Sequence, residues 1–169
     1  MPSEITETLD LPQMVQSNED PNRTAYTVSV DASHETVTTG ISAHDRALTC
    51  RSLASPSSKQ SSFRRPGHVF PLRARHGGIG QRQGHTEAAV EFCHLAGKYP
   101  VGVICELVED GSNKPLKAER PGGGMMRRDG CLAFGKQWGL KVCTIEDLVD
   151  HMEAEKEQKQ HGPQQNGVT

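Results

Sequence analysis

Apolar and polar residues alternate in the stretch TAYTVSVD (residues 24–31), which is the period expected of a strand with one buried face. Farther along, residues 100–108 (PVGVICELV) are almost continuously apolar and rich in β-branched side chains. Such a run is typical of a strand that is covered on both faces. We therefore expect residues 101–107 to form an interior strand.

Other stretches carry helix signals, each opening on a Ser, Thr or Asp that can accept a hydrogen bond from a backbone N–H. The predicted helices are residues 41–54 with Ser42 as cap and Asp45 three residues on, 86–97 with Thr86 as cap and Gly97 as stop, 129–138 between Asp129 and Gly139, and 144–159 with Thr144 and Asp147 as caps. Residues 55–62 and 109–128 are predicted to be loops, the latter long and mobile, and residues 140–143 (LKVC) a short strand. Because helices and strands alternate without internal repeats, the pattern favours an α/β or mixed layered fold.

The length of 169 residues fits one domain, although 34% apolar and 4% aromatic residues are few for a large core. We expect a single domain over residues 1–159 and a disordered tail over residues 160–169. The chain has no apolar run long enough to span a membrane and no secretory pattern at its start. The sequence therefore predicts a cytoplasmic protein without a membrane partner.

The cysteines are five in number, widely spaced, and none belongs to a C-x-x-C pair. We expect them to be small buried hydrophobic residues in a reducing compartment, rather than a zinc site or a disulfide framework.

The segment between Ser61 and Thr86 carries five arginines, three histidines and no carboxylate, in a chain with a formal net charge of -2. Arginine forks match oxyanions, and a helix start adds free N–H groups and a favourable dipole, so Arg82 to Thr86 is a candidate phosphate site. Alternatively, the arginines are simply solvated and the glycines make turns. The glycine spacing fits neither the dinucleotide fingerprint nor the nucleotide P-loop. Too few aromatic residues lie nearby for nucleic-acid binding, so we expect no nucleic-acid partner.

Ionisable residues add candidate chemistry. Glu106 falls inside the apolar run, where an unpaired carboxylate would be costly, so it should face a cation or titrate unusually, as a proton-transfer group does. The alternative is that it lies at a strand end and points to solvent. His68 and His85 suit either an ordinary hydrogen-bonding role or metal ligation.

These residues together resemble a known family. RRPGHVFPLRARHGGIGQRQGHTEAAVEF, preceded by TTGISAHDRALT and followed by GVICELV and GLKVCTIEDLV, is similar to 3,4-dihydroxy-2-butanone 4-phosphate synthase of riboflavin biosynthesis. The likeness covers nearly everything from Leu9 to His151, and the loop before GMMRRDGC is similar to the fungal form. The resemblance implies an α/β (α+β) fold with three layers, in which helices flank a mixed β-sheet.

The resemblance also implies an activity and a site. The family is a lyase that converts ribulose 5-phosphate into the four-carbon ketose phosphate and formate, with Mg²⁺ or Mn²⁺, at a homodimer interface. His68 and Glu106 match the two positions required for the chemistry, Thr38, Thr39 and Asp45 match a segment near the pocket, and His85 matches the metal ligand. The substrate-binding segment matches Arg82, Gln83, Gly84, His85 and Thr86.

One departure concerns metal binding. Family members open with an acidic segment whose carboxylates hold magnesium, and these 169 residues contain no matching motif. One imidazole is a poor magnesium site on its own. We therefore expect an N-terminally incomplete form of the fold with little activity as it stands, or else a non-catalytic homologue that keeps the sugar-phosphate pocket and dimer surface and acts as a binding or regulatory partner.

Overall fold

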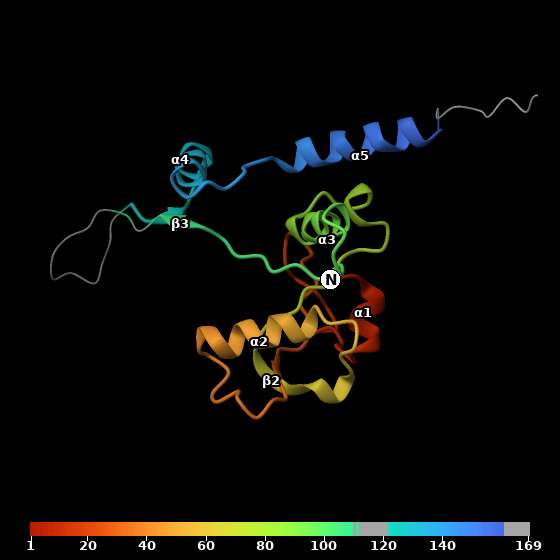
Figure 1. Ribbon diagram of the computed structural model, residues 1–169, viewed down its shortest axis with the longest axis vertical. Coiled ribbons are helices and arrows are strands. Elements are labelled where there is room, and N and C mark those ends of the chain that lie inside the picture. The colour runs from red at the N-terminus through yellow and green to blue at the C-terminus, as the bar shows by residue number, and fades with distance from the viewer. Residues whose placement is uncertain (110, 112–121, 161–169) are drawn as a thin grey trace, which may run out of the picture. The chain divides into compact units, whose positions relative to one another are not determined.

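The computed structural model describes residues 1–109, 111 and 122–160. Contacts within the chain divide it into two compact units, Met1–Ile104 and Cys105–Thr169. Each unit is described by itself, and Figure 1 labels their main elements.

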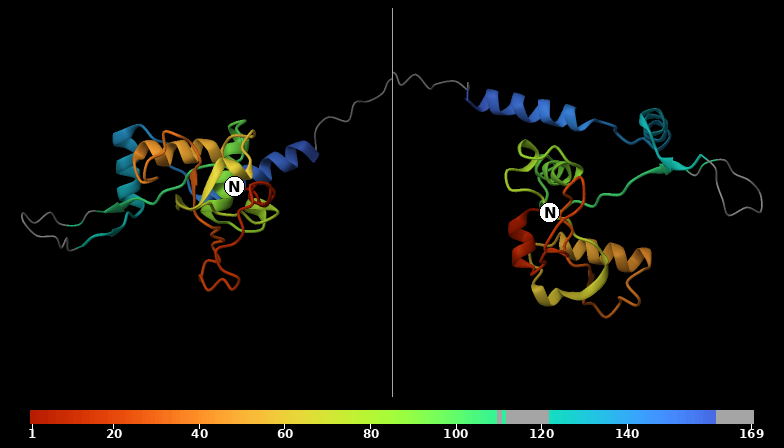
Figure 2. Two further views of the ribbon diagram at one scale, coloured as in Figure 1. Left: turned by 90° about the horizontal axis from the view of Figure 1, so that it is seen from below. Right: turned by 180° about the vertical axis from the view of Figure 1, so that it is seen from behind.

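The first unit contains an antiparallel strand pair with a helix packed against it. Its elements are α1 (Ser3–Thr8), β1 (Val30–Ala32), α2 (Ala43–Leu53), β2 (Phe63–Val69) and α3 (His85–Leu95), with short 3₁₀ turns at Gln60–Ser62 and Gly78–Gly80. β1 pairs with β2, and α2 lies beside both strands, as Figures 1 and 2 show from several sides. Two isolated bridges, Gln13 with Thr27 and Tyr26 with Leu72, extend this region.

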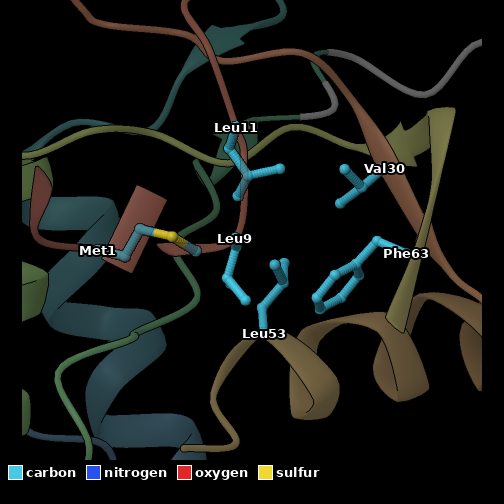
Figure 3. Close-up of a cluster of buried hydrophobic side chains, with 6 residues drawn as sticks. All are labelled: Met1, Leu9, Leu11, Val30, Leu53 and Phe63. Carbon is cyan, nitrogen blue, oxygen red and sulfur yellow. The ribbon is translucent and has the colours of Figure 1, made fainter. Parts of the chain in front are cut away.

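The core of the first unit lies where these elements meet. Six buried side chains gather there from the N-terminal segment, β1, α2 and β2, and Figure 3 shows them facing one another: Met1, Leu9, Leu11, Val30, Leu53 and Phe63. Burying one such side chain stabilises a fold by roughly 1.5–3 kcal/mol. This cluster therefore fixes β1 and β2, the strands that carry the candidate site.

The second unit consists of a short strand pair and two helices. Its elements are β3 (Val108–Glu109), β4 (Gly124–Met125), α4 (Arg128–Trp138) and α5 (Ile145–Gln160). β3 and β4 are antiparallel. α5 begins after Thr144, whose hydroxyl accepts the Asp147 N–H at 3.0 Å and donates to the Asp147 carboxylate at 2.8 Å.

Several sequence predictions are confirmed. The mixed α/β class is present, and the helix after Ser42 begins as expected, with the Ser42 hydroxyl accepting the Asp45 N–H. Thr144 and Asp147 also cap their helix. Gly97 and Gly139 follow the ends of α3 and α4 with φ of 62° and 65°, a conformation that glycine adopts without strain.

Other predictions are wrong. Residues 101–107 form no strand, and Val103 and Ile104 are exposed; residues 140–143 also lack strand structure. Neither Thr86 nor Asp129 caps a helix, because α3 starts at His85 after Gly84, and α4 starts at Arg128 after Arg127. The basic segment is not simply a loop, since it contains β2.

The cysteines are free but not fully buried, which corrects the expectation of buried hydrophobic residues. Cys50, Cys93 and Cys131 are partly buried, whereas Cys105 and Cys143 are exposed. Within the described ranges, no helix has both the length and the apolar character needed to span a membrane. Residues 161–169 of the predicted tail and most of the predicted 109–128 loop fall outside the described residues, whereas Gln160 is the last residue of α5.

Candidate functional site

His68 on β2 is held by the carboxylate of Asp31 on β1. Oδ1 of Asp31 accepts the backbone N–H of His68 at 2.9 Å, and Oδ2 lies 2.7 Å from Nδ1 of the ring. Asp31 is buried, whereas the His68 side chain remains 43% exposed. The pair thus has a protected carboxylate and an imidazole that a small molecule can reach.

An irregular strand pairing explains this contact. Val30 pairs with Val69 and Asp31 with Arg64, so residues 65–68 bulge out of the ladder. Backbone N–H groups in a bulge lose their partners on the neighbouring strand. Here side chains of β1 and the residue before it replace those partners, because the hydroxyl of Ser29 accepts the Gly67 N–H at 3.2 Å and Asp31 accepts that of His68.

Gly40 lies directly against the Asp31–His68 pair. A Cβ at this position would lie 2.2 Å from Oδ2 of Asp31 and 2.5 Å from Nδ1 of His68. Its φ of 84° is also in the left-handed region. Only glycine fits here without displacing the pair.

Asp45, near the start of α2, fixes the loop that contains Gly40. Its Oδ2 accepts hydrogen bonds from the Thr38 N–H at 3.2 Å, the Thr38 hydroxyl at 2.9 Å and the Gly40 N–H at 3.0 Å. Burial raises the pKa of Asp45, but hydrogen bonds from His44, Thr38, Gly40 and Ser42 outweigh it and lower the pKa from 3.8 to about 2. This ionised carboxylate therefore holds the loop over the Asp31–His68 pair.

A second cluster lies at the start of α3, where Arg82 binds Glu87. Nη1 of Arg82 donates to Oε2 of Glu87 at 2.6 Å, and Nη2 donates to the carbonyl of Asn22 at 3.0 Å. Oε1 of the fully buried Glu87 side chain accepts the backbone N–H of Arg75 at 2.9 Å. Arg82 thus joins the chain around residue 22 to the start of the helix.

The other predicted substrate-binding residues surround this helix start. Gly84 precedes α3 and no side chain caps the helix there. His85 and Gln83 are exposed, and Thr86 is buried. The arrangement leaves backbone N–H groups of the first turn available to an anion.

A basic hollow lies close to this segment along the chain. It has a volume of about 340 Å³, and its lining includes three arginines and a histidine but no carboxylate: Arg23, Arg73, Arg75 and His76. It is thus a second place in the first unit where positive charge faces an open space.

The predicted site residues do not form one constellation within a unit. In the part of the chain that the structure describes, no hydrogen bond or ion pair joins the His68 cluster to the Arg82 cluster. Glu106 is exposed and belongs to the second unit, so its predicted place in an interior strand is wrong. Its partnership with His68 stays a prediction.

Sequence reasoning missed two buried carboxylates, Asp31 and Glu87. Asp31 follows Val30 at the end of an alternating strand pattern, and Glu87 falls one residue after Thr86 at the start of a predicted helix. Both stand beside apolar residues, where a carboxylate needs a charged or donating partner. The same signal that indicated Glu106, a carboxylate next to apolar residues, is therefore present at both positions.

The described residues do not by themselves form a magnesium site. Among residues 1–109, 111 and 122–160, no group of three or more His, Cys, Asp or Glu side chains could hold a metal ion. His85 supplies a single exposed imidazole, whereas Mg²⁺ prefers several oxygen ligands in octahedral geometry. The donor set therefore does not fit the metal, and His85 as a ligand stays a prediction.

The fold and the two clusters define a mixed α/β protein with a carboxylate–histidine pair and a basic helix start. The family model described as 3,4-dihydroxy-2-butanone 4-phosphate synthase matches residues 1–151. A protein of that name from Pyricularia oryzae is 63% identical over 150 residues, which are 89% of this chain and 64% of the relative. The Schizosaccharomyces pombe protein of that name is 53% identical over 155 residues, 90% of this chain and 70% of the relative.

Solved structures agree with these matches. A 3,4-dihydroxy-2-butanone 4-phosphate synthase crystallised with two magnesium ions has a TM-score of 0.90 and 61% identity, covering 92% of this chain and 72% of its own. A cation-free form has a TM-score of 0.86 and 59% identity over the same shares. The chain belongs to the 3,4-dihydroxy-2-butanone 4-phosphate synthase family. It spans about two thirds of the length of the curated fungal relatives.

Proposed function

We propose that this chain serves as a 3,4-dihydroxy-2-butanone 4-phosphate synthase, a lyase of riboflavin biosynthesis that acts on ribulose 5-phosphate and releases formate. The observation that carries the proposal is the family match over residues 1–151, which includes every predicted site residue. The relatives named above are synthases, which favours the lyase over a non-catalytic homologue.

His68 is the proposed proton-transfer group of the first cluster. Proton removal beside a carbonyl requires a base near the reacting carbon, and an imidazole held in one orientation suits this role. The bond to Asp31 and the glycine at position 40 support the assignment, because both keep the ring in place. Glu106 is proposed as the second proton-transfer group.

The start of α3 is the proposed phosphate site. The two hydrogen bonds that Arg82 makes to Glu87 and Asn22 use two of its five N–H groups. The remaining donors can address an oxyanion together with the free N–H groups of the first helical turn. Thr86, Gly84, Gln83 and His85 complete the proposed substrate-binding segment.

A homodimer is the proposed assembly. Among the described residues no hydrogen bond or ion pair links the His68 cluster to the Arg82 cluster, and Glu106 lies outside the unit that contains both. In a dimer with a two-fold axis the same surface of each copy faces the other, so a site at the interface can draw residues from both copies. Residues 1–159 are proposed to act as a single domain of a cytoplasmic enzyme.

The proposed cofactor is a divalent cation, either Mg²⁺ or Mn²⁺. The structural relative with two magnesium ions supports a divalent cation in the family chemistry. Mg²⁺ and Mn²⁺ are both hard cations that accept oxygen ligands, and the described residues favour neither.

The test is formate release from ribulose 5-phosphate, measured with a formate dehydrogenase coupled assay. The 169-residue chain is compared with a form that carries the family's acidic N-terminal segment. We expect formate from the extended form and its loss in His68→Ala and Glu106→Ala. Absence of formate from a folded extended form would contradict the proposal, as would full activity in both variants.

A further inference from the structure

The basic hollow that contains Arg75 is separate from the two clusters of the proposed active site. Its volume of about 340 Å³ is at the low end of the range for small-molecule sites. Its lining comprises arginine, histidine, neutral polar and alanine side chains, and neither His68 nor any residue of the 82–86 segment is among them. A cleft lined by charges of one sign concentrates small ions of the opposite sign. The hollow is therefore suited to a small anion.

The chain itself neutralises little of the positive charge in the hollow. Arg73 pairs with the carboxylate of Glu7, which is 65% exposed, and an exposed pair is weak. Nη1 of Arg23 donates to the Asn18 carbonyl at 2.8 Å, which leaves its charge uncompensated. The side chain of Arg75 has no hydrogen bond or ion pair with any residue that the structure describes. The free donors of these arginines therefore face solvent.

One wall of the hollow is the loop of residues 18–24, which is fixed by its own hydrogen bonds. The side chain of Asn18 donates to the Thr24 carbonyl and accepts the Asp20 N–H, both at 2.9 Å. Oδ2 of Asp20 accepts the Thr24 N–H at 2.7 Å. These bonds hold Arg23 at a φ of 53°, a left-handed conformation that few residues with a Cβ adopt. Because the loop is ordered in advance, a ligand that binds Arg23 loses little affinity to ordering the chain.

The start of α3 supports two walls of the hollow without belonging to its lining. Nη2 of Arg82 donates to the Asn22 carbonyl in the 18–24 loop at 3.0 Å. Oε1 of Glu87 accepts the backbone N–H of Arg75 at 2.9 Å. Arg82 and Glu87 are also bound to each other, at 2.6 Å. This pair therefore links the loop that carries Arg23 to the segment that carries Arg75.

We propose that the hollow is a second anion site, distinct from the proposed substrate-phosphate site at Arg82, and that it binds a small molecule carrying one or two phosphate groups. Arginine forks match phosphate oxygens, and Arg23 and Arg75 supply them from two segments of the chain. The small volume and a lining without aromatic side chains disfavour a nucleic-acid strand. The proposal goes beyond the lyase function and does not depend on it.

The test is calorimetry of the 169-residue chain with inorganic pyrophosphate. We expect Arg75→Gln and Arg23→Gln each to weaken binding about tenfold, the effect of losing a hydrogen bond to a charged group. Arg75→Gln keeps the backbone N–H that binds Glu87, so it removes the cation and leaves the wall in place. Arg51→Gln is the matched control, because Arg51 is an exposed arginine of α2 outside the lining, and its affinity should equal that of the wild type.

Arg82→Lys separates the hollow from the substrate-phosphate site. We expect this variant to retain wild-type affinity for pyrophosphate, with backbone amide signals of residues 18–24 and 73–76 shifting on binding. A loss in Arg82→Lys with none in Arg75→Gln would place the anion at the substrate site and overturn the proposal. Equal losses in both variants would show one shared site, and no loss in either would show unspecific binding; both results also overturn it.

Formate release distinguishes this inference from the proposed function. If the chain extended with the acidic segment releases no formate while pyrophosphate binds through Arg75, the lyase assignment fails and the second anion site stands. If formate is released and the Arg75→Gln affinity for pyrophosphate equals that of the wild type, the second site is wrong and the lyase assignment stands.

Discussion

Arg82 and Glu87 form an ion pair across the start of α3, with 2.6 Å between Nη1 and Oε2. Glu87 is fully buried, and Arg82 is about a quarter exposed. Gly84 lies beneath the pair, since a Cβ there would lie 2.3 Å from Nη1 of Arg82. The guanidinium proposed to bind phosphate is thus also the partner of a buried charge.

Arg82→Ala should therefore lower the free energy of unfolding as well as affinity. The substitution leaves Glu87 buried without its cation, and losing one member of a buried pair typically costs about 3–5 kcal/mol. Urea unfolding measures the effect. The control is Arg73→Ala, because Arg73 pairs with a Glu7 side chain that is 65% exposed, and an exposed pair contributes about 1 kcal/mol or less. Equal losses for the two variants would contradict the structural role of Glu87.

Arg82→Lys is the better probe of phosphate binding, since it keeps a cation beside Glu87 but removes the planar fork. We expect the affinity for ribulose 5-phosphate to fall about tenfold, which is roughly 1.4 kcal/mol. Calorimetry with ribulose 5-phosphate and with unphosphorylated ribulose measures it. Arg75→Lys tests the neighbouring basic hollow. A loss confined to Arg75→Lys would move the phosphate site to that hollow, and equal affinity for the two sugars would exclude a phosphate site.

Helices were predicted better than strands because their hydrogen bonds are local. Two helix starts can be recognised within four residues of sequence, because a capping residue accepts the N–H of an aspartate three positions on: Ser42 with Asp45, and Thr144 with Asp147. A strand needs a partner from elsewhere in the chain. Residues 101–107 have a strand composition but lack a partner strand in the described chain, and the composition alone does not create one.

The candidate site was predicted in part for the same reason. The histidines and arginines stand out in the sequence, whereas their partners depend on tertiary pairing. The Asp31–His68 contact joins residues 37 positions apart, through a bulge in β2. An Arg-Pro-Gly sequence is typical of a loop, so the sequence predicts neither β2 nor the contact between Asp31 and His68.

Asp45 should make stability depend on pH in the acid range. Its pKa is lowered from 3.8 to about 2 in the folded chain, so its contribution is fully present above about pH 4 and is lost as the pH falls through 2. We expect Asp45→Asn to be less stable than the wild type at pH 7, and the difference to shrink toward pH 2. Thermal unfolding at several pH values measures it. Asp129→Asn, at an exposed position, is the control and should show little difference at any pH. A constant Asp45→Asn deficit from pH 7 to pH 2 would show that ionisation of Asp45 is not its cause.

Gly40→Ala should disturb the Asp31–His68 pair. The new Cβ would overlap Oδ2 of Asp31 and Nδ1 of His68, and the residue would also adopt a left-handed φ. We expect a loss of stability and a changed ¹⁵N spectrum of His68. Gly97→Ala is the matched control. Gly97 has a positive φ of 62° and no atom within 4 Å of a Cβ built there, so the substitution should cost only about 1–2 kcal/mol, from the left-handed backbone alone, and leave His68 unchanged. If the two variants gave similar His68 spectra, the backbone near Gly40 would have shifted to make room for the new Cβ without moving Asp31 or His68.

Magnesium binding gives the sharpest test of what the described residues can do. His85 is an exposed first residue of α3, and no cluster of three candidate ligands surrounds it among the described residues. Magnesium binds weakly where it finds one or two protein ligands and keeps most of its water. We therefore expect the 169-residue chain to bind Mg²⁺ with a Kd of about 1 mM or weaker, and His85→Ala to change it little.

Addition of the family's acidic segment should tighten binding and make it depend on His85, because several carboxylate oxygens and one imidazole would then share the ion. Calorimetry measures the affinity, and broadening of the His85 signals by Mn²⁺ locates the ion. Tight binding by the 169-residue chain that disappears in His85→Ala would show that ligands within these residues suffice.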